Sequence, residues 1–224
     1  MSMRTKNQKT KDLLEFINSE QLDNFSYAVF DLDQTLYDYE TCNQNGVSSV
    51  LKNIDDNFNI DEKTALNAYL KARHSINQQL KNTSSMHSRF LYLKQMCKIL
   101  SIEDSTTNTL QFYDIYWKSF FEKIELFDWV VPTFKKLQEK NIVIVIATDF
   151  NARLQFLKIQ KLKINGYIAE IITSQEVGIE KPSQQFAEKV LNFTNTSYNK
   201  IFCVGDNPKK DIFLSNYDIK TFII

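Results

Sequence analysis

The feature that most constrains the fold is an uninterrupted run of six apolar residues from Ile142 to Ala147, most of them β-branched. Such runs are typical of a parallel strand that is covered on both faces. Shorter segments with strand character flank it along the chain: Tyr27–Phe30, Glu170–Thr173, Ile201–Val204 and Lys220–Ile224. A parallel sheet that is covered on both faces is therefore expected.

Segments with helical spacing of apolar residues lie between the later strands. They are Asn151–Leu162, Ser183–Phe193 and Pro208–Asn216. Strands joined by helices pair in parallel through right-handed crossovers. The sequence thus predicts the α/β class, with a doubly wound, Rossmann-like parallel sheet of about five strands.

A long region after the first strand has no convincing strand of its own. Its apolar residues recur at helical intervals in four segments: Thr41–Ile54, Asp61–Leu80, Ser85–Leu100 and Thr106–Lys123. A further short helix is expected at Lys9–Glu20, ahead of the first strand. We therefore predict an α/β core domain of residues 1–37 and 126–224, with a helical bundle of residues 38–125 inserted into it.

The charge balance excludes some partners. Lys and Arg total 27, as do Asp and Glu, so no excess positive field attracts a nucleic acid or an anionic membrane. The three cysteines form no close pairs, which argues against a disulfide framework or a zinc site. No apolar run is long enough to span a bilayer. We expect a cytoplasmic protein without a nucleic-acid or membrane partner.

Two aspartates, Asp31 and Asp33, follow directly after the first predicted strand. In open α/β sheets, ligands bind beyond the carboxyl ends of the strands. Two carboxylates placed there repel each other without a cation, so a divalent metal site is one interpretation. An Asx turn that simply closes the strand is the other. These two residues alone do not decide between them.

Polar residues also follow the second strand and precede a later helix. Thr148 and Asp149 stand just before a helix start near Asn151, where free N–H groups can bind an anion; helix capping is the simpler explanation. Lys181 lies in a loop that Pro182 restricts, and its ammonium could neutralise carboxylates and phosphate together. A solvated surface lysine would be the ordinary alternative.

The fourth strand ends in Gly205 and Asp206, with Asp211 five residues further on. Gly205 permits close approach of the backbone, and both carboxylates can turn to the same crevice. Oxygen ligands without nitrogen or sulfur favour magnesium over zinc. Polar signals at four successive strand ends indicate one site rather than four unrelated turns.

In order and spacing, these motifs resemble the haloacid dehalogenase (HAD) superfamily, in the branch with a helical cap after the first strand. The resemblance covers nearly the whole chain. The segment Asp31–Thr35 looks like the DxDxT motif, Thr148 like the second-strand Ser or Thr, Lys181 like the lysine motif, and Gly205–Asp211 like GDxxxxD. Asp149 departs from the family's frequent Asn.

The resemblance implies that Asp31 is a nucleophile that forms an aspartyl-phosphate. Asp33 would protonate the leaving alkoxide and then accept a proton from the attacking water. Dehalogenases of the family lack this second aspartate, because a halide needs no acid to leave. The resemblance therefore favours a phosphatase over a dehalogenase.

The resemblance also implies Mg²⁺, held by the side chains of Asp31 and Asp206 and by the backbone carbonyl of Asp33. Phosphoryl oxygens would be bound by Thr148, Asp149 and Lys181. Asp211 would position Lys181 or a metal-bound water.

The substrate is expected to be a small phosphorylated metabolite, such as a sugar phosphate or a nucleotide, bound by a monomer or a homodimer. Arg89, at the start of a predicted cap helix, is a candidate to bind a second anionic group of the substrate. Polar residues on the cap helices are ordinarily exposed, and Arg89 is the best exception. Two alternatives remain open. A sugar phosphomutase shares both aspartates, and a non-catalytic binding protein could retain the fold.

Overall fold

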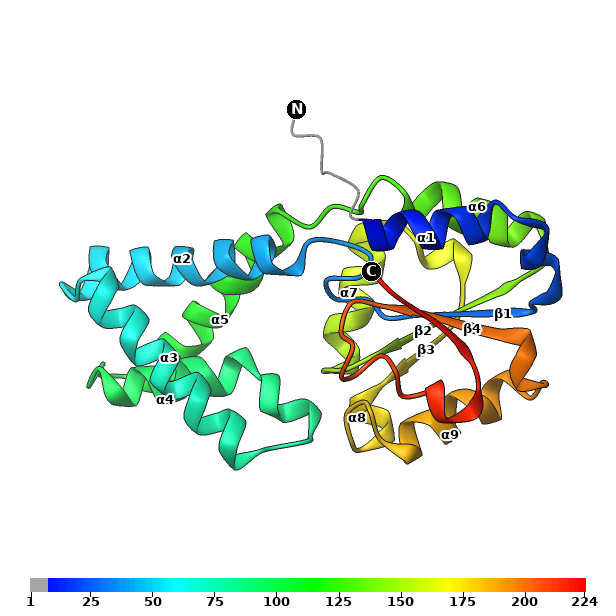
Figure 1. Ribbon diagram of the computed structural model, residues 1–224. Helices are drawn as coiled ribbons and strands as arrows, with labels where there is room; N and C mark the ends of the chain where they lie inside the picture. Colours follow the sequence, from blue (N-terminus) through cyan, green and yellow to red (C-terminus); the bar gives the residue numbers. More distant parts are fainter. Residues whose placement is uncertain (1–7) are drawn as a thin grey trace. The chain divides into compact units, whose positions relative to one another are not determined.

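The computed structural model describes residues 8–224 and contains one parallel sheet of five strands (Figure 1). The strand order is β3-β2-β1-β4-β5. The strands are β1 (Tyr27–Phe30), β2 (Val143–Thr148), β3 (Ile168–Thr173), β4 (Ile201–Gly205) and β5 (Lys220–Ile223). The predicted α/β class and the doubly wound parallel sheet are confirmed. The apolar run of residues 142–147 largely coincides with β2, which lies next to the central strand β1.

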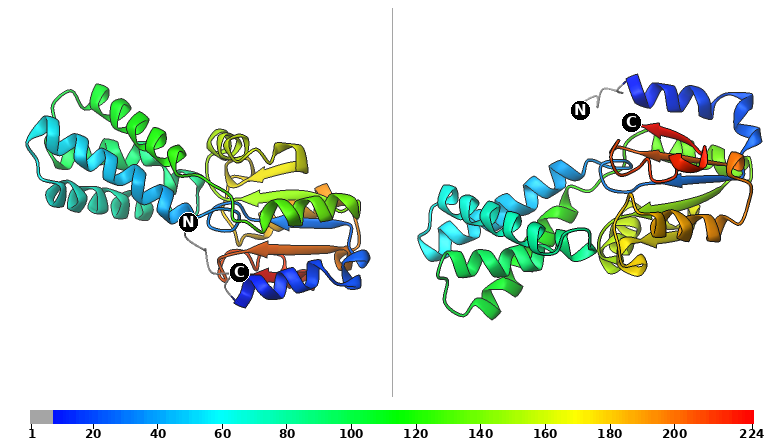
Figure 2. Two further views of the ribbon diagram at one scale, coloured as in Figure 1. Left: turned by 90° about the horizontal axis from the view of Figure 1, so that it is seen from above. Right: turned by 60° about the horizontal axis from the view of Figure 1, so that its bottom comes forward.

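Helices cover both faces of this sheet (Figures 1 and 2). They are α1 (Gln8–Ile17), α6 (Val130–Glu139), α7 (Ala152–Leu162), α8 (Ser174–Val177) and α9 (Gln184–Thr194). Alternate strand residues point to opposite faces. Phe30 of β1 therefore packs on Phe134 of α6, whereas its neighbour Val29 belongs to the core cluster that contains Phe186 of α9. Helix α6 is not predicted from the sequence, although the buried residues of this helix have helical spacing.

Residues 39–124 form a second compact unit of four long helices. They are α2 (Tyr39–Phe58), α3 (Glu62–Gln79), α4 (Arg89–Ile99) and α5 (Ser105–Glu122). Within this unit α2 packs on α5 and α3 packs on α4. The other unit holds the sheet and runs up to Asp38 and again from Glu125. Residues 1–7 of the first predicted core segment lie outside the described residues.

The predicted helix Pro208–Asn216 is wrong. The segment forms consecutive turns up to Leu214, and a short 3-10 helix follows. The Asp211 carboxylate accepts a hydrogen bond from the Asn207 N–H at 2.9 Å, and side chains that bond nearby backbone in this way compete with helix formation. The other elements are short 3-10 helices: η1 (Glu20–Asn24), η2 (Ser84–His87), η3 (Asn165–Tyr167), η4 (Tyr198–Lys200) and η5 (Ser215–Tyr217).

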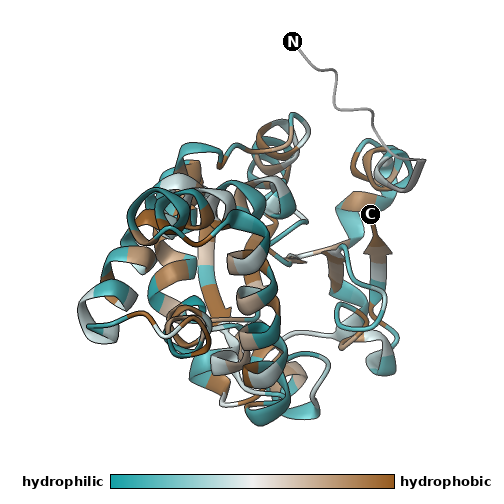
Figure 3. Ribbon diagram, turned by 90° about the vertical axis from the view of Figure 1, so that its left-hand side faces the viewer, coloured by the Kyte–Doolittle hydropathy of each residue, from teal (hydrophilic) through white to brown (hydrophobic). Residues whose placement is uncertain are grey.

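Hydropathy along the chain follows this architecture (Figure 3). The longer helices show alternating hydrophilic and hydrophobic bands, as expected for helices with one buried face. Among residues 8–224, no helix combines the length and the apolar character that a membrane crossing requires. All three cysteines, Cys42, Cys97 and Cys203, are buried, and none forms a disulfide with another described residue.

Candidate active site

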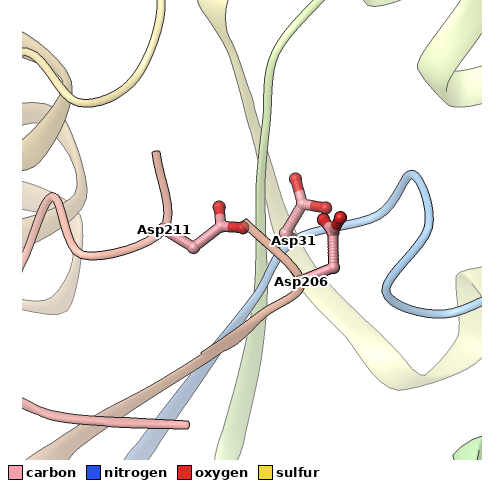
Figure 4. A group of neighbouring side chains, drawn as sticks. All are labelled: Asp31, Asp206 and Asp211. Carbon is pink, nitrogen blue, oxygen red and sulfur yellow. The ribbon is translucent and has the colours of Figure 1, made fainter. Parts of the chain in front are cut away.

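The carboxyl ends of three neighbouring strands bring the predicted residues together. Asp31 follows β1, Thr148 ends β2, and Asp206 follows β4. Because β1 lies between β2 and β4, these side chains share one edge of the sheet. Figure 4 shows the carboxylates of Asp31 and Asp206 beside each other, with Asp211 pointing toward them.

Lys181 links two of the carboxylates. Its Nζ lies 2.8 Å from Asp31 Oδ1 and 2.6 Å from Asp211 Oδ1, and it also donates to the carbonyl of Ala147 at 2.9 Å. Lys181 is 4% exposed. Burial disfavours its charge, but Asp31 and Asp211 outweigh this effect and raise the pKa of Lys181 above its usual range. A permanent ammonium therefore stands beside Asp31.

The three aspartates offer a set of oxygen ligands. One oxygen each from Asp31, Asp206 and Asp211 lies within 4.8 Å of the others. Burial, followed by the neighbouring carboxylate of Asp211, raises the pKa of Asp31 to about 8 and that of Asp206 to about 6. Lys181 only partly offsets the rise at Asp31. Crowded, buried carboxylate oxygens of this kind fit a hard divalent cation such as Mg²⁺.

Thr148 is held by a residue that the sequence does not single out. Gln155 Nε2, on the second turn of α7, donates to Thr148 Oγ1 at 2.6 Å and to the carbonyl of Asp149 at 2.8 Å. Asn151 caps α7 by accepting from the Leu154 N–H, so capping does not require Thr148. The Thr148 hydroxyl is buried at the strand edge.

Asp149 holds the loop of Lys181 rather than the start of the helix. Its Oδ1 accepts from the Lys181 N–H at 2.9 Å, and its Oδ2 accepts from Lys210 Nζ at 2.7 Å. Lys210 also pairs with Glu180 at 2.8 Å. Although burial opposes the charge of Lys210, Asp149 and Glu180 raise its pKa. The extra carboxylate at position 149 is thus balanced by Lys210.

Asp33 has a separate set of partners. Both of its carboxylate oxygens lie 2.8 Å from Nζ of Lys158, and the Tyr37 hydroxyl and Gln155 amide also donate to it. Burial is the largest single effect and would raise its pKa, but Lys158 together with the hydrogen bonds of Tyr37 and Gln155 outweighs burial, and the pKa of Asp33 is lowered. Its side chain is not among the three clustered carboxylates. Metal binding through its backbone carbonyl stays a prediction.

Lys158, Gln155 and Lys210 are the charged and polar partners that sequence reasoning missed. A signal existed for two of them, because Gln155 and Lys158 are three residues apart on one helix and so share a face. That helix begins just after Thr148. A helical lysine is otherwise indistinguishable from a solvated one, and its partner Asp33 lies 125 residues away.

Arg89 belongs to the helical unit and is not exposed. It is 8% exposed, and its guanidinium donates to the Tyr116 hydroxyl, the His87 carbonyl and the Asn43 amide oxygen. These bonds tie together helices α2, α4 and α5. Contact of Arg89 with substrate stays a prediction, and its side chain is buried within the helical unit.

Comparisons with known proteins agree with this geometry. The family of haloacid dehalogenase-like hydrolases matches residues 28–222. A ribulose-1,5-bisphosphate 5-phosphatase from Halopiger xanaduensis is 28% identical and covers 84% of this chain and 80% of its own length. A glyceraldehyde 3-phosphate phosphatase from Methanocaldococcus jannaschii is 25% identical over 82% of this chain and 77% of its own.

A solved structure shares the fold. The 2-haloacid dehalogenase from Pseudomonas syringae pv. Tomato superimposes with a TM-score of 0.65 at 19% identity, over 88% of this chain and 85% of that one. The chain belongs to the haloacid dehalogenase-like hydrolases. The two curated relatives named above are phosphatases.

Proposed function

We propose that this protein is a magnesium-dependent phosphatase that hydrolyses a small phosphorylated metabolite through an aspartyl-phosphate. The contact that supports the proposal most directly is the 2.8 Å pair between Asp31 Oδ1 and Lys181 Nζ. It lies at the strand edge that also carries the Thr148 hydroxyl. A carboxylate beside a buried ammonium and hydroxyl suits attack on phosphorus, because both donors can hold phosphoryl oxygens.

The proposed reaction has two steps. Asp31 forms a bond to phosphorus while the bond to the leaving oxygen breaks, and Asp33 gives a proton to that oxygen. The lowered pKa of Asp33 without substrate means that Asp33 must take up this proton when the substrate binds. Water then attacks the phosphorus of the aspartyl-phosphate, and Asp33 takes the proton of that water. The products are an alcohol, inorganic phosphate and the free Asp31 carboxylate.

In this proposal Mg²⁺ would be held by the side chains of Asp31 and Asp206 and the backbone carbonyl of Asp33. When bound, it reduces the repulsion between a carboxylate and a phosphate dianion. Asp211 acts through Lys181, which it contacts at 2.6 Å. The requirement for an acid at Asp33 supports phosphate esters over halides, because an alkoxide is a poor leaving group.

The named relatives support a sugar phosphate as substrate, since they act on ribulose-1,5-bisphosphate and glyceraldehyde 3-phosphate. The balance of 27 basic and 27 acidic residues also supports a small substrate over a nucleic acid. We propose a cytoplasmic location for the same reaction.

The test is the release of inorganic phosphate from p-nitrophenyl phosphate and a panel of sugar phosphates and nucleotides. We expect turnover with Mg²⁺, none with a chelator, and at least about a 10³-fold loss in kcat for Asp31→Asn. Asp12→Asn, on the exposed side of α1, is the control and should match the wild type.

Three results would contradict the proposal. The first is full activity of Asp31→Asn, which would exclude this nucleophile. The second is transfer of phosphate between positions of a hexose phosphate with little net release, which would indicate a phosphomutase. The third is Mg²⁺ binding without turnover of any ester, which would indicate a binding protein.

A further inference from the structure

Lys158 is an unusual lysine because its side chain is completely buried, at 0% exposure. A buried ammonium is tolerated only with partners that offset its loss of hydration. Both oxygens of Asp33 lie 2.8 Å from its Nζ. Two contacts to one carboxylate restrict the plane of that carboxylate, whereas a single contact would leave it free to rotate.

Gln155 lies one turn earlier on the same face of α7 and is also fully buried. Its Nε2 contacts three acceptors: Thr148 Oγ1 at 2.6 Å, the Asp149 carbonyl at 2.8 Å and Asp33 Oδ2 at 3.3 Å. Gln155 therefore spans the distance between the proposed phosphate-binding hydroxyl and the proposed acid and base.

The oxygen of the Gln155 amide reduces the stability of the fold. Its Oε1 is buried and has no hydrogen-bond partner among residues 8–224. Buried polar atoms without partners reduce stability. A side chain present for stability alone would be replaced by an apolar one at lower cost, so the contacts of Nε2 are what its placement serves.

We infer that Lys158 and Gln155 are positioning residues of the reaction, which hold the Asp33 carboxylate in one orientation and join it to Thr148. The inference rests on the proposed function, in which Asp33 must reach the leaving oxygen and later the attacking water. A carboxylate that is held in place serves both steps, because each proton transfer requires hydrogen-bond distance and alignment.

A purely structural role makes a different prediction. If Lys158 only stabilises the fold, its removal should reduce turnover equally whether or not Asp33 is present. If Lys158 acts through Asp33, its removal should have little further effect once Asp33 is an asparagine. The comparison therefore needs four enzymes: the wild type, Lys158→Met, Asp33→Asn and the double variant.

The substrate for this cycle is p-nitrophenyl phosphate with Mg²⁺, since its phenolate leaves without an acid and Asp33→Asn should retain measurable turnover. We expect Lys158→Met to lower kcat about 100-fold with KM changed less than about threefold. In the Asp33→Asn background the same change should alter kcat less than about twofold. Lys161→Met, an exposed lysine on the same helix, should match the wild type.

A second measurement follows the covalent intermediate. When water attack lacks an oriented base, the aspartyl-phosphate persists, so acid-quenched Lys158→Met should contain more phosphorylated enzyme by mass spectrometry than the wild type. Gln155→Leu should show the same direction of change, with Gln160→Leu, exposed on the same helix, as its control. Circular dichroism checks that each variant is folded, and Gln155→Leu tests the inference if Lys158→Met does not fold.

The results separate the inference from the proposed function. Wild-type turnover by Asp33→Asn would contradict the acid and base assignment itself. Impaired Asp33→Asn together with equal losses for Lys158→Met in both backgrounds would overturn only the inference. Unchanged kcat and unchanged phosphoenzyme in folded Lys158→Met or Gln155→Leu would overturn it as well.

Discussion

Asp31 and Asp33 are the same residue type two positions apart, but their surroundings differ. Asp31 shares Lys181 with Asp211, and burial together with Asp211 keeps its pKa high. Asp33 has both oxygens on Lys158, which lowers its pKa despite burial. Without a cation, these shifts are opposite to the ionisation that the proposed roles require, because a nucleophile must be ionised and an acid must carry a proton. A cation bound beside Asp31 favours the ionised form of that carboxyl group.

The raised pKa values of Asp31 and Asp206 predict how stability depends on pH and Mg²⁺. Both pKa values exceed the ordinary value of 3.8, at about 8 for Asp31 and about 6 for Asp206. The folded state therefore binds more protons than the unfolded state from about pH 3.8 up to about pH 8. Without a cation, their contribution to stability is full below pH 3.8 and is lost as pH rises through 6 and then 8. Deprotonated carboxylates are the form that binds a cation.

We therefore expect Mg²⁺ to raise the melting temperature more at about pH 8.5 than at about pH 5.5. Differential scanning fluorimetry with millimolar Mg²⁺ or with a chelator measures the melting temperature at each pH. Asp206→Asn should lose most of the Mg²⁺ effect at the higher pH. An equal Mg²⁺ effect at both pH values would show that these carboxylates are not the ligands.

At the scale of elements, the strands and most helices could be predicted because their signals are local. The β-branched run appears as β2, and the predicted helix near Asn151 appears as α7. The segment after β4 could not be predicted, since its turns depend on Asp211 bonding the Asn207 backbone and Lys181 from another part of the chain. Helix-like composition does not reveal such competition.

The close approach of β4 to this segment gives a further prediction. A Cβ at Gly205 would lie 2.3 Å from Asp211 Cγ and 2.4 Å from Asp211 Cβ. Since Asp211 is held by Lys181, Gly205→Ala must displace both. We expect a loss of about 1–3 kcal/mol in the free energy of unfolding, measured with urea, and at least about a tenfold loss of turnover.

Gly166→Ala is the matched control, because a Cβ there has no neighbour within 4 Å. It should change neither the urea midpoint nor turnover appreciably. Equal behaviour of the two alanine variants would mean that the contact between Gly205 and Asp211 does not hold the site.

At the scale of the whole molecule, the sheet unit holds together the two points where the helical unit is inserted. The Phe127 N–H donates to the Leu36 carbonyl at 3.0 Å, and Tyr37 pairs with Leu126. These contacts lie within the unit that carries the sheet. Its core cluster, which spans Val29 to Ile219, also consists of residues of that unit alone.

We expect a chain in which a short glycine-rich linker replaces residues 39–124 to fold cooperatively, because the chain ends to be joined are already paired. Thermal unfolding followed by circular dichroism measures this. Adding Phe127→Pro, which removes the N–H bonded to Leu36, should lower the melting temperature. A shortened chain without a cooperative transition would show that the sheet unit depends on the helical one.

The sequence by itself determined the α/β class, the parallel sheet and the strand ends at which Asp31, Thr148 and Asp206 stand. These features follow from apolar periodicity and from the rule that parallel strands end at one edge. The tertiary structure alone decided that Lys158 serves Asp33, whereas the pairing of Lys181 with Asp31 and Asp211 was implied only by the family resemblance. Lys181 and Lys158 lie 150 and 125 residues from Asp31 and Asp33, and only burial distinguishes them from solvated lysines. Charge pairing at such separations depends on packing, which no local pattern encodes.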